Sequence, residues 1–334
     1  MVEHGGTTNL ERQIRSQPDE LERMLGDPRL REQVHTAAEG LHRVRRIWVV
    51  GTGTSQHAAA LGAAMLQDAG RSAHAVSSMQ FVRNAPIVGP HDGVIVITHT
   101  GETAYALAAR ALAFQAGLQT FTICRRGLAL NDIVETVDRE TSETYTVSYT
   151  AALLALAMIA SKMGADTLGG DQLALIPGAV RNAIEASGVE GLPRPERTVS
   201  IIGAGHGAIT AREGALKIRE AARQLAEGND AEYLLHGTAV PLGARDHVLA
   251  LITPDEDGFV RAVAAAAAAE GIPVTTLAEP SPLPVVLAQI PLTVRLQLLA
   301  LRFATERGQD PDKVIVGRWD DTALWSIGGP PGMA

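Results

Sequence analysis

Two carboxylates and a lysine recur at helical spacing in the stretch Glu213-Gly-Ala-Leu-Lys-Ile-Arg-Glu220. Glu213, Lys217 and Glu220 stand at positions i, i+4 and i+7, so in a helix they share one face. His236 follows sixteen residues after Glu220, in a segment that is predicted to be a loop. Carboxylates, a lysine and a histidine could together carry out proton transfer. The alternative is a solvated helix face with ion pairs between its turns, and an unrelated loop histidine.

Hydroxyl side chains gather in two other segments, each of which follows a predicted buried strand. Gly51-Thr-Gly-Thr-Ser55 follows the apolar run 47–50, and Thr98-His-Thr-Gly-Glu-Thr103 follows the run 94–97. Hydroxyls and backbone N–H groups at a helix N-terminus bind phosphate without basic side chains. Ser and Thr are also common N-caps, which is the structural alternative. The two segments together predict a phosphate site at the carboxyl ends of parallel strands.

Other cofactor signatures are weak or absent in the sequence. There is no Gly-Lys-Ser/Thr phosphate loop, and Gly203-x-Gly205-x-x-Ala208 fits only the loose dinucleotide pattern. The histidines lack metal-ligand spacing, and Cys124 is the only cysteine. We therefore expect no cofactor and no metal.

Strands alternate with helices along most of the chain, which predicts an α/β fold with a doubly wound parallel sheet. The pattern then begins again: Gly203-Ala-Gly205 lies 152 residues after Gly51-Thr-Gly53. Later elements recur at a similar separation of about 152 to 156 residues. We therefore expect a helical segment over 1–43 and two tandem domains with flanking helices, over 44–188 and 189–334.

Several local predictions depend on single residues. Pro18 is expected to separate a helix at 9–16 from one at 19–25. The stretch 213–225 is expected to be helical, and the polar stretch 137–144 reads as a loop or a last edge strand.

The composition excludes several classes of partner. The 334 residues carry a net charge of −8, which argues against a nucleic-acid or anionic-membrane surface. The polar N-terminus predicts no signal peptide. The apolar runs 151–160 and 262–269 are too short to span a bilayer. We expect a cytoplasmic protein.

These motifs together resemble the SIS (sugar isomerase) domain family, in two tandem copies covering roughly residues 10–316. The resemblance is to the isomerase half of glucosamine-6-phosphate synthases and to stand-alone aminosugar-phosphate deaminases. Gly53-Thr-Ser55 matches the family's phosphosugar loop, and the segment 98–103 matches its Ser-Gln-Ser-Gly-Glu-Thr loop. The 213–220 stretch and His236-Gly237 match its catalytic segment.

The resemblance implies a role for each of these segments. Glu220 would move a proton between C1 and C2 of the sugar, and Lys217 would orient Glu220 or hold the sugar oxygens in place. His236 would open the sugar ring and would come from a neighbouring subunit, which implies a homodimer. The implied substrate-binding residues are Gly53, Thr54, Ser55, Thr98, His99, Thr100 and Thr103.

The chain departs from the family pattern at several of these positions. His99 stands where relatives have a glutamine, and Thr238 where they have a proline. Ser148-Tyr-Thr150 lacks the lysine of the family's Ser-Thr-Lys motif. Relatives carry a tail lysine that forms a Schiff base, and here Lys313 is the only candidate, several residues earlier than expected.

The lead expectation is a phosphosugar isomerase that converts glucosamine 6-phosphate to fructose 6-phosphate and ammonia, or catalyses the reverse amination. The sequence lacks the family's glutaminase half, so ammonia would be free or supplied by a partner. Two alternatives stay open: a deglycase acting on a sugar-phosphate amine adduct, and a non-catalytic phosphosugar sensor.

Overall fold

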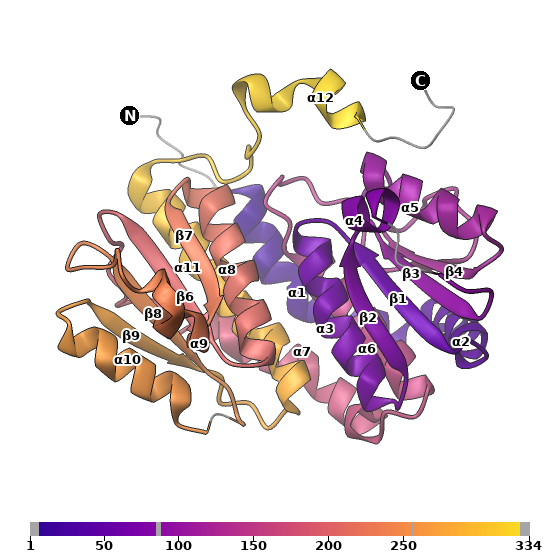
Figure 1. Cartoon of the computed structure of the whole chain (residues 1–334), viewed down its shortest axis with the longest axis horizontal. Coiled ribbons are helices and arrows are strands. Elements are labelled where there is room, and N and C mark those ends of the chain that lie inside the picture. Colours follow the sequence, from indigo (N-terminus) through magenta and orange to yellow (C-terminus); the bar gives the residue numbers. More distant parts are fainter. Residues whose placement is uncertain (1–6, 85–87, 256, 328–334) are drawn as a thin grey trace. The chain divides into compact units, whose positions relative to one another are not determined.

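A computed structural model of the chain describes residues 7–84, 88–255 and 257–327 (Figure 1). The chain divides into two compact units, each built around one parallel sheet. The sheet A unit comprises Asp19–Glu140, Val147–Leu175 and Ile315–Ala334. The sheet B unit comprises Met1–Pro18, Thr141–Thr146 and Ile176–Val314.

Sheet A is five-stranded, with the order β2-β1-β3-β4-β5 and every neighbouring pair parallel. Its strands are β1 (Arg46–Gly51), β2 (Ser72–Ser77), β3 (Asp92–Ile97), β4 (Gln119–Cys124) and β5 (Ile133–Glu135). Its helices are α2 (Pro28–His42), α3 (Thr54–Asp68), α4 (Ser78–Arg83), α5 (Ala104–Gln115), α6 (Val147–Lys162), η1 (Asp166–Leu168), η3 (Gly317–Asp320) and α12 (Thr322–Ser326). The helices α1 (Asn9–Gly26) and α7 (Gly170–Glu185) contain the points at which the division falls.

The core of the sheet A unit follows from apolar strands that are covered by helices on their faces. Val50, Val94 and Val96 pack with Ala106 and Ala109 of α5. Helix α6 is buried along its whole length from residue 147 to residue 160. Continuous apolar strands of this kind are typical of parallel sheets.

Sheet B has four parallel strands in the order β7-β6-β8-β9. The strands are β6 (Thr198–Gly203), β7 (Leu225–Asp230), β8 (His247–Ile252) and β9 (Val274–Ala278). The helices of this unit are α8 (His206–Ala222), α9 (Ala231–Tyr233), η2 (Leu234–Thr238), α10 (Phe259–Ala269) and α11 (Val285–Arg307).

Helix α11 is the one helix in the described residues that is long and apolar enough to cross a membrane. It meets that test by length and composition only. Its most apolar stretch of 18 residues is 78% buried inside the structure, as in a core helix. It packs against α8 as a core helix of the sheet B unit.

The parallel α/β architecture with flanking helices confirms the predicted fold class in its coarse form. The four strands of sheet B repeat the order of β2-β1-β3-β4, but descent from a tandem duplication remains a prediction. The domain boundaries at 43/44 and 188/189 also remain predictions.

Two local predictions are corrected by the structure, and one that left two alternatives is resolved. Pro18 does not break a helix, because α1 runs through it, and Gln17 Nε2 donates to Ile14 O (3.1 Å), the carbonyl that Pro18 leaves without its helical donor. The helix predicted over 213–225 ends earlier, because α8 ends at Ala222 and β7 begins at Leu225. For 137–144 the loop alternative is confirmed, because the last strand of sheet A is β5 and no strand is assigned over 137–144.

Candidate active site

The turn from β1 into α3 places two hydroxyls in the first turn of a helix. A Cβ at Gly51 would lie 2.2 Å from Ser55 O, and Gly53 has a φ of +57°, so both positions require glycine. Thr54 and Ser55 follow at the start of α3 and are partly exposed. These hydroxyls therefore lie at the positive end of the helix dipole, where an anion is stabilised.

The second hydroxyl-rich loop follows β3 and leads into α5. Thr98 is 3% exposed, and in the described part of the chain its buried hydroxyl has no hydrogen-bond partner. Thr100 Oγ1 accepts a hydrogen bond from Glu102 N (3.2 Å), and Thr103 is the N-cap of α5 but makes no capping hydrogen bond with its side chain. A buried hydroxyl without a partner is costly, which favours a ligand at this loop.

The two loops lie at the same edge of sheet A. Strands β1 and β3 are hydrogen-bonded neighbours and run parallel, so the loops that follow them both lie at the carboxyl edge of the sheet. This is the edge at which open α/β sheets bind ligands. The predicted grouping of these two segments is therefore confirmed by the sheet topology.

His99 is held by the backbone of the neighbouring loop. Its Nε2 accepts a hydrogen bond from Glu140 N (3.1 Å). Burial, with Arg125 and Arg139 nearby, lowers the pKa of His99 to about 4, so the ring is neutral near pH 7. The carboxylate of Glu140 accepts from Ser148 N (2.8 Å) in the first turn of α6. A substrate contact by His99 stays a prediction.

The predicted cluster on α8 forms within the sheet B unit. Lys217 Nζ lies 2.5 Å from Glu220 Oε2 and 3.5 Å from Glu213 Oε1. The side chains of Lys217 and Glu213 are fully buried, whereas that of Glu220 is 21% exposed. A buried ammonium between two carboxylates is not a solvated helix face, and Glu220 is the member of the cluster that solvent reaches.

Glycines allow the neighbouring elements to approach α8 closely. A Cβ at Gly214 would lie 2.4 Å from Leu296 Cδ1 of α11, and one at Gly228 of β7 would lie 2.3 Å from Ala211 C. Side chains at these two positions would push α11 and β7 away. The Lys217–Glu220 pair is therefore carried by a tightly packed helix.

His236 lies on the surface of the sheet B unit. It belongs to η2, where Gly237 has a φ of +107°, and its side chain is 70% exposed. Its Nε2 lies 3.6 Å from Glu232 Oε1. In the described chain no hydrogen bond or ion pair joins His236 to Glu220 or Lys217. Its role in ring opening stays a prediction.

The backbone of Lys313 is held near the end of α8. Arg223, which has a φ of +49° and ends the helix, donates from Nη2 to Lys313 O (3.3 Å). Asp312 accepts from the N–H groups of Asn9 and Leu10 at the start of α1. The Lys313 side chain is exposed. The Schiff-base role of Lys313 stays a prediction. Hydrogen bonds to Arg223, Asn9 and Leu10 hold the segment 312–313 in place.

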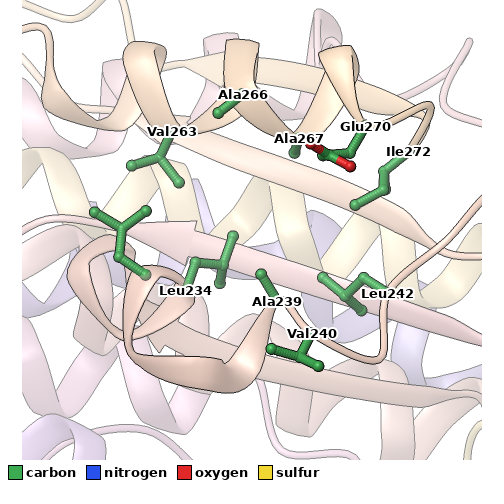
Figure 2. A pocket seen from close by; sticks show the side chains of 10 residues that line it. Leu234, Ala239, Val240, Leu242, Val263, Ala266, Ala267, Glu270 and Ile272 are labelled. Carbon is green, nitrogen blue, oxygen red and sulfur yellow. The ribbon is translucent and has the colours of Figure 1, made fainter.

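An apolar cavity of about 360 Å³ lies beside η2 in the sheet B unit (Figure 2). It is lined by Leu234, Leu235, Ala239, Val240, Leu242, Val263, Ala266, Ala267, Glu270 and Ile272. The lining offers no cation or hydroxyl for a phosphate, so this cavity does not suit a sugar phosphate.

No metal site is found in the residues that the structure describes, since no three His, Cys, Asp or Glu side chains cluster there. Cys124 is buried, and burial raises the pKa of its thiol to about 12, which makes it a poor nucleophile.

Sequence reasoning missed two residues beside the second loop, Arg125 and Glu140. Arg125 directly follows β4, and its N–H donates to His99 O (3.1 Å). Its position at the end of a predicted strand was a signal that could have been used. Glu140 had no such signal, because its role depends on a distant histidine.

Comparison with known proteins finds similarity to a sugar-isomerase-type family in part of the chain, and it supports the fold. Residues 40–162 match the family model described as SIS domain. The glutamine–fructose-6-phosphate aminotransferase of Thermococcus kodakarensis is 30% identical over 322 residues, which are 85% of this chain and 53% of that protein. The chain spans about half the length of the curated relatives it matches.

Solved structures show the same fold. Glucosamine-6-phosphate deaminase from Thermotoga maritima matches with a TM-score of 0.76 at 18% identity, over 92% of this chain and 97% of that chain. Tagatose-6-phosphate ketose/aldose isomerase from Escherichia coli matches with a TM-score of 0.76 at 21% identity, over 96% of this chain and 99% of that chain. At these sequence identities the structural similarity shows the fold alone. The two proteins are named for different activities, one a deaminase and the other an isomerase.

Proposed function

We propose that this chain, whose residues 40–162 match the SIS domain model, converts glucosamine 6-phosphate to fructose 6-phosphate and ammonia, or catalyses the reverse amination. The observation that carries the proposal is the Glu213–Lys217–Glu220 cluster, because a fully buried lysine holds a carboxylate that still reaches solvent. Such a fixed carboxylate suits proton transfer between adjacent carbons.

In the proposed reaction Glu220 acts as base and then as acid. Its carboxylate removes the proton from C2 of the open-chain amino aldehyde while O1 takes a proton from water, giving an enolamine. The same C2 proton is then returned to C1, and the nitrogen gives a proton back to water. The product is the imine of fructose 6-phosphate, which water hydrolyses to the ketose and ammonia. Lys217 keeps Glu220 in position through the 2.5 Å contact.

The phosphate is assigned to the two hydroxyl-rich loops of the sheet A unit. Thr54, Ser55 and Thr103 lie at helix N-termini, and the unpartnered hydroxyl of Thr98 is available to a phosphate oxygen. Gly53, His99 and Thr100 shape these loops. This assignment does not depend on turnover.

The remaining parts of the proposal concern groups on the surface. His236 is 70% exposed, which is compatible with action on a substrate held by a second subunit of a homodimer. Lys313 would form the Schiff base with the open ketose. We further propose a cytoplasmic enzyme that uses free ammonia, or ammonia from a partner, in the reverse direction.

A non-catalytic sensor is the second candidate, and it is favoured by His99 and Thr238 in the loops and by the early position of Lys313 in the tail. In that case the loops of sheet A would bind a sugar phosphate and Glu220 would have no chemical role. A deglycase would use the same residues on a sugar-phosphate amine adduct.

The test measures ammonia release and ketose formation from glucosamine 6-phosphate by the parent and by Glu220→Gln. We expect kcat to fall about 10²- to 10⁴-fold in the variant, while the Kd for fructose 6-phosphate changes little. Glu185→Gln, at an exposed position on α7, is the matched control and should keep parental turnover. Equal turnover by Glu220→Gln and parent would refute the role of Glu220, and binding without turnover by the parent would support the sensor.

A further inference from the structure

Arg125 lies beside the second hydroxyl-rich loop, at the carboxyl edge of sheet A. It directly follows β4, and its backbone N–H donates to His99 O (3.1 Å). On the same pair of strand ends, Thr98 N donates to Ile123 O (3.0 Å). These two bonds continue the pairing of β3 with β4 beyond the sheet and fix Arg125 next to the loop.

The charge of Arg125 is not balanced by a carboxylate. Its Nη1 donates to Arg126 O (3.0 Å), and its buried Nε has no hydrogen-bond partner among the residues described. No acidic side chain in the described ranges forms an ion pair with it. A partly buried cation without a counter-charge is unfavourable, because it loses hydration and gains no ionic partner.

The neighbouring arginines are neutralised, which sets Arg125 apart. Arg126 forms a bidentate ion pair with Asp138, in which Nε donates to Oδ1 (2.9 Å) and Nη2 donates to Oδ2 (2.6 Å). Arg139 makes a two-pronged pair with Glu102, with distances of 2.7 and 3.0 Å. The free positive charge at this loop is therefore that of Arg125.

We propose that Arg125 binds the phosphate group of the substrate, together with the unpartnered hydroxyl of Thr98. A guanidinium donates two parallel hydrogen bonds to phosphate oxygens, and charge-assisted bonds of this kind are stronger than neutral ones. This contact rests on the proposed function for the sugar, but the phosphate itself needs only the loop.

The state of His99 agrees with a positive field at this loop. Arg125 is the second cause, after burial, of the lowered pKa of His99, and Arg139 is the third. The same field that disfavours an imidazolium favours an anion. A neutral His99 leaves Arg125 as the cation that an incoming phosphate meets.

The experiment compares Arg125→Met with Arg126→Met by calorimetric titration, using inorganic phosphate and fructose 6-phosphate at low and at high ionic strength. Both arginines are partly buried and adjacent in sequence, but Arg126 already has its carboxylate. We expect Kd for both ligands to rise about tenfold or more in Arg125→Met and to change less than about twofold in Arg126→Met. The loss should shrink at high ionic strength. Arg125→Lys should restore part of the affinity.

Three outcomes would overturn the inference: parental affinity in Arg125→Met, an equal loss in Arg126→Met, or no binding of either ligand by the parent. A parent that binds phosphate through Arg125 but releases no ammonia would sustain the inference while the proposed reaction fails. A parent that deaminates while Arg125→Met keeps parental affinity would do the reverse.

Discussion

Replacing His99 by glutamine should remove a pH dependence from the stability of the folded chain. In the native structure His99 Nε2 accepts from Glu140 N (3.1 Å), so the ring has to be unprotonated at that nitrogen. Glutamine can accept the same bond through its amide oxygen and does not titrate. The substitution therefore keeps the contact and removes the proton-binding group.

The magnitude follows from the pKa of His99 in the two states. It is about 4 in the folded chain, lowered chiefly by burial and then by Arg125 and Arg139, against 6.5 for an ordinary histidine. The unfolded chain therefore binds a proton first as the pH falls. The stabilisation is fully present above pH 6.5, is reduced by about 2 kcal/mol at pH 5, and is reduced by about 3 kcal/mol at pH 4.

Urea unfolding of the parent and of His99→Gln between pH 7 and pH 4 tests this. Other groups titrate in both proteins, so the quantity to compare is the difference in unfolding free energy between them at each pH. We expect that difference to move in favour of the variant by about 3 kcal/mol across the range, with unchanged m-values. Parallel curves would show that His99 is not held neutral by its surroundings.

Two further predictions concern α8. Gly214→Ala should destabilise the chain by about 1–3 kcal/mol, because the new Cβ would lie 2.4 Å from Leu296 Cδ1. Gly178→Ala in α7 has open space around it and should stabilise the chain by about 0.5–1 kcal/mol. Thermal unfolding of both variants checks this, and equal changes in Tm would contradict it. Lys217→Met should cost about 3–5 kcal/mol, because it removes the cation that lies 3.5 Å from the fully buried Glu213 carboxylate. The exposed Lys162→Met is the control, and similar urea midpoints for the two variants would refute the reasoning.

The central strands were predictable because their apolar runs are local signals. Strands β1 and β3 lie where the apolar runs 47–50 and 94–97 predicted them. Strand β7 was missed, because Leu225–Asp230 contains Gly228, Asn229 and Asp230 and lacks such a run. Its place beside β6 depends on the close approach of Gly228 to Ala211, which only the tertiary structure reveals.

The continuous helix α1 could not be predicted either, because its passage through Pro18 depends on a side chain that replaces the missing donor. Proline normally ends a helix, because it removes a donor and leaves a carbonyl without a partner. In α1 the Gln17 side chain replaces that donor at Ile14 O. Gln17 Nε2 also donates to Gln297 Oε1 (2.8 Å) of α11, so the compensation is fixed by a residue far away in the sequence.

The candidate site divides in a similar way. The hydroxyl-rich loops and the Glu213–Lys217–Glu220 face were predicted, because each is contained in one short segment. Arg125 and Glu140 were not, because their importance comes from what surrounds them. Glu140 is recognised by its bonds to His99 and Ser148, and Arg125 by a missing carboxylate.

The glycines of α8 explain how a buried lysine is compatible with a stable helix. Glycine at position 214 lowers helix propensity, so on local grounds it weakens the helix that carries Glu220. It is tolerated because it lets Leu296 of α11 pack directly on the helix backbone, one turn before Lys217. On the same helix, the side chains of Lys217 and Glu213 are fully buried. A side chain at 214 would separate α8 from α11 and admit water to the ion pair, so we expect Gly214→Ala to lower kcat as well as stability.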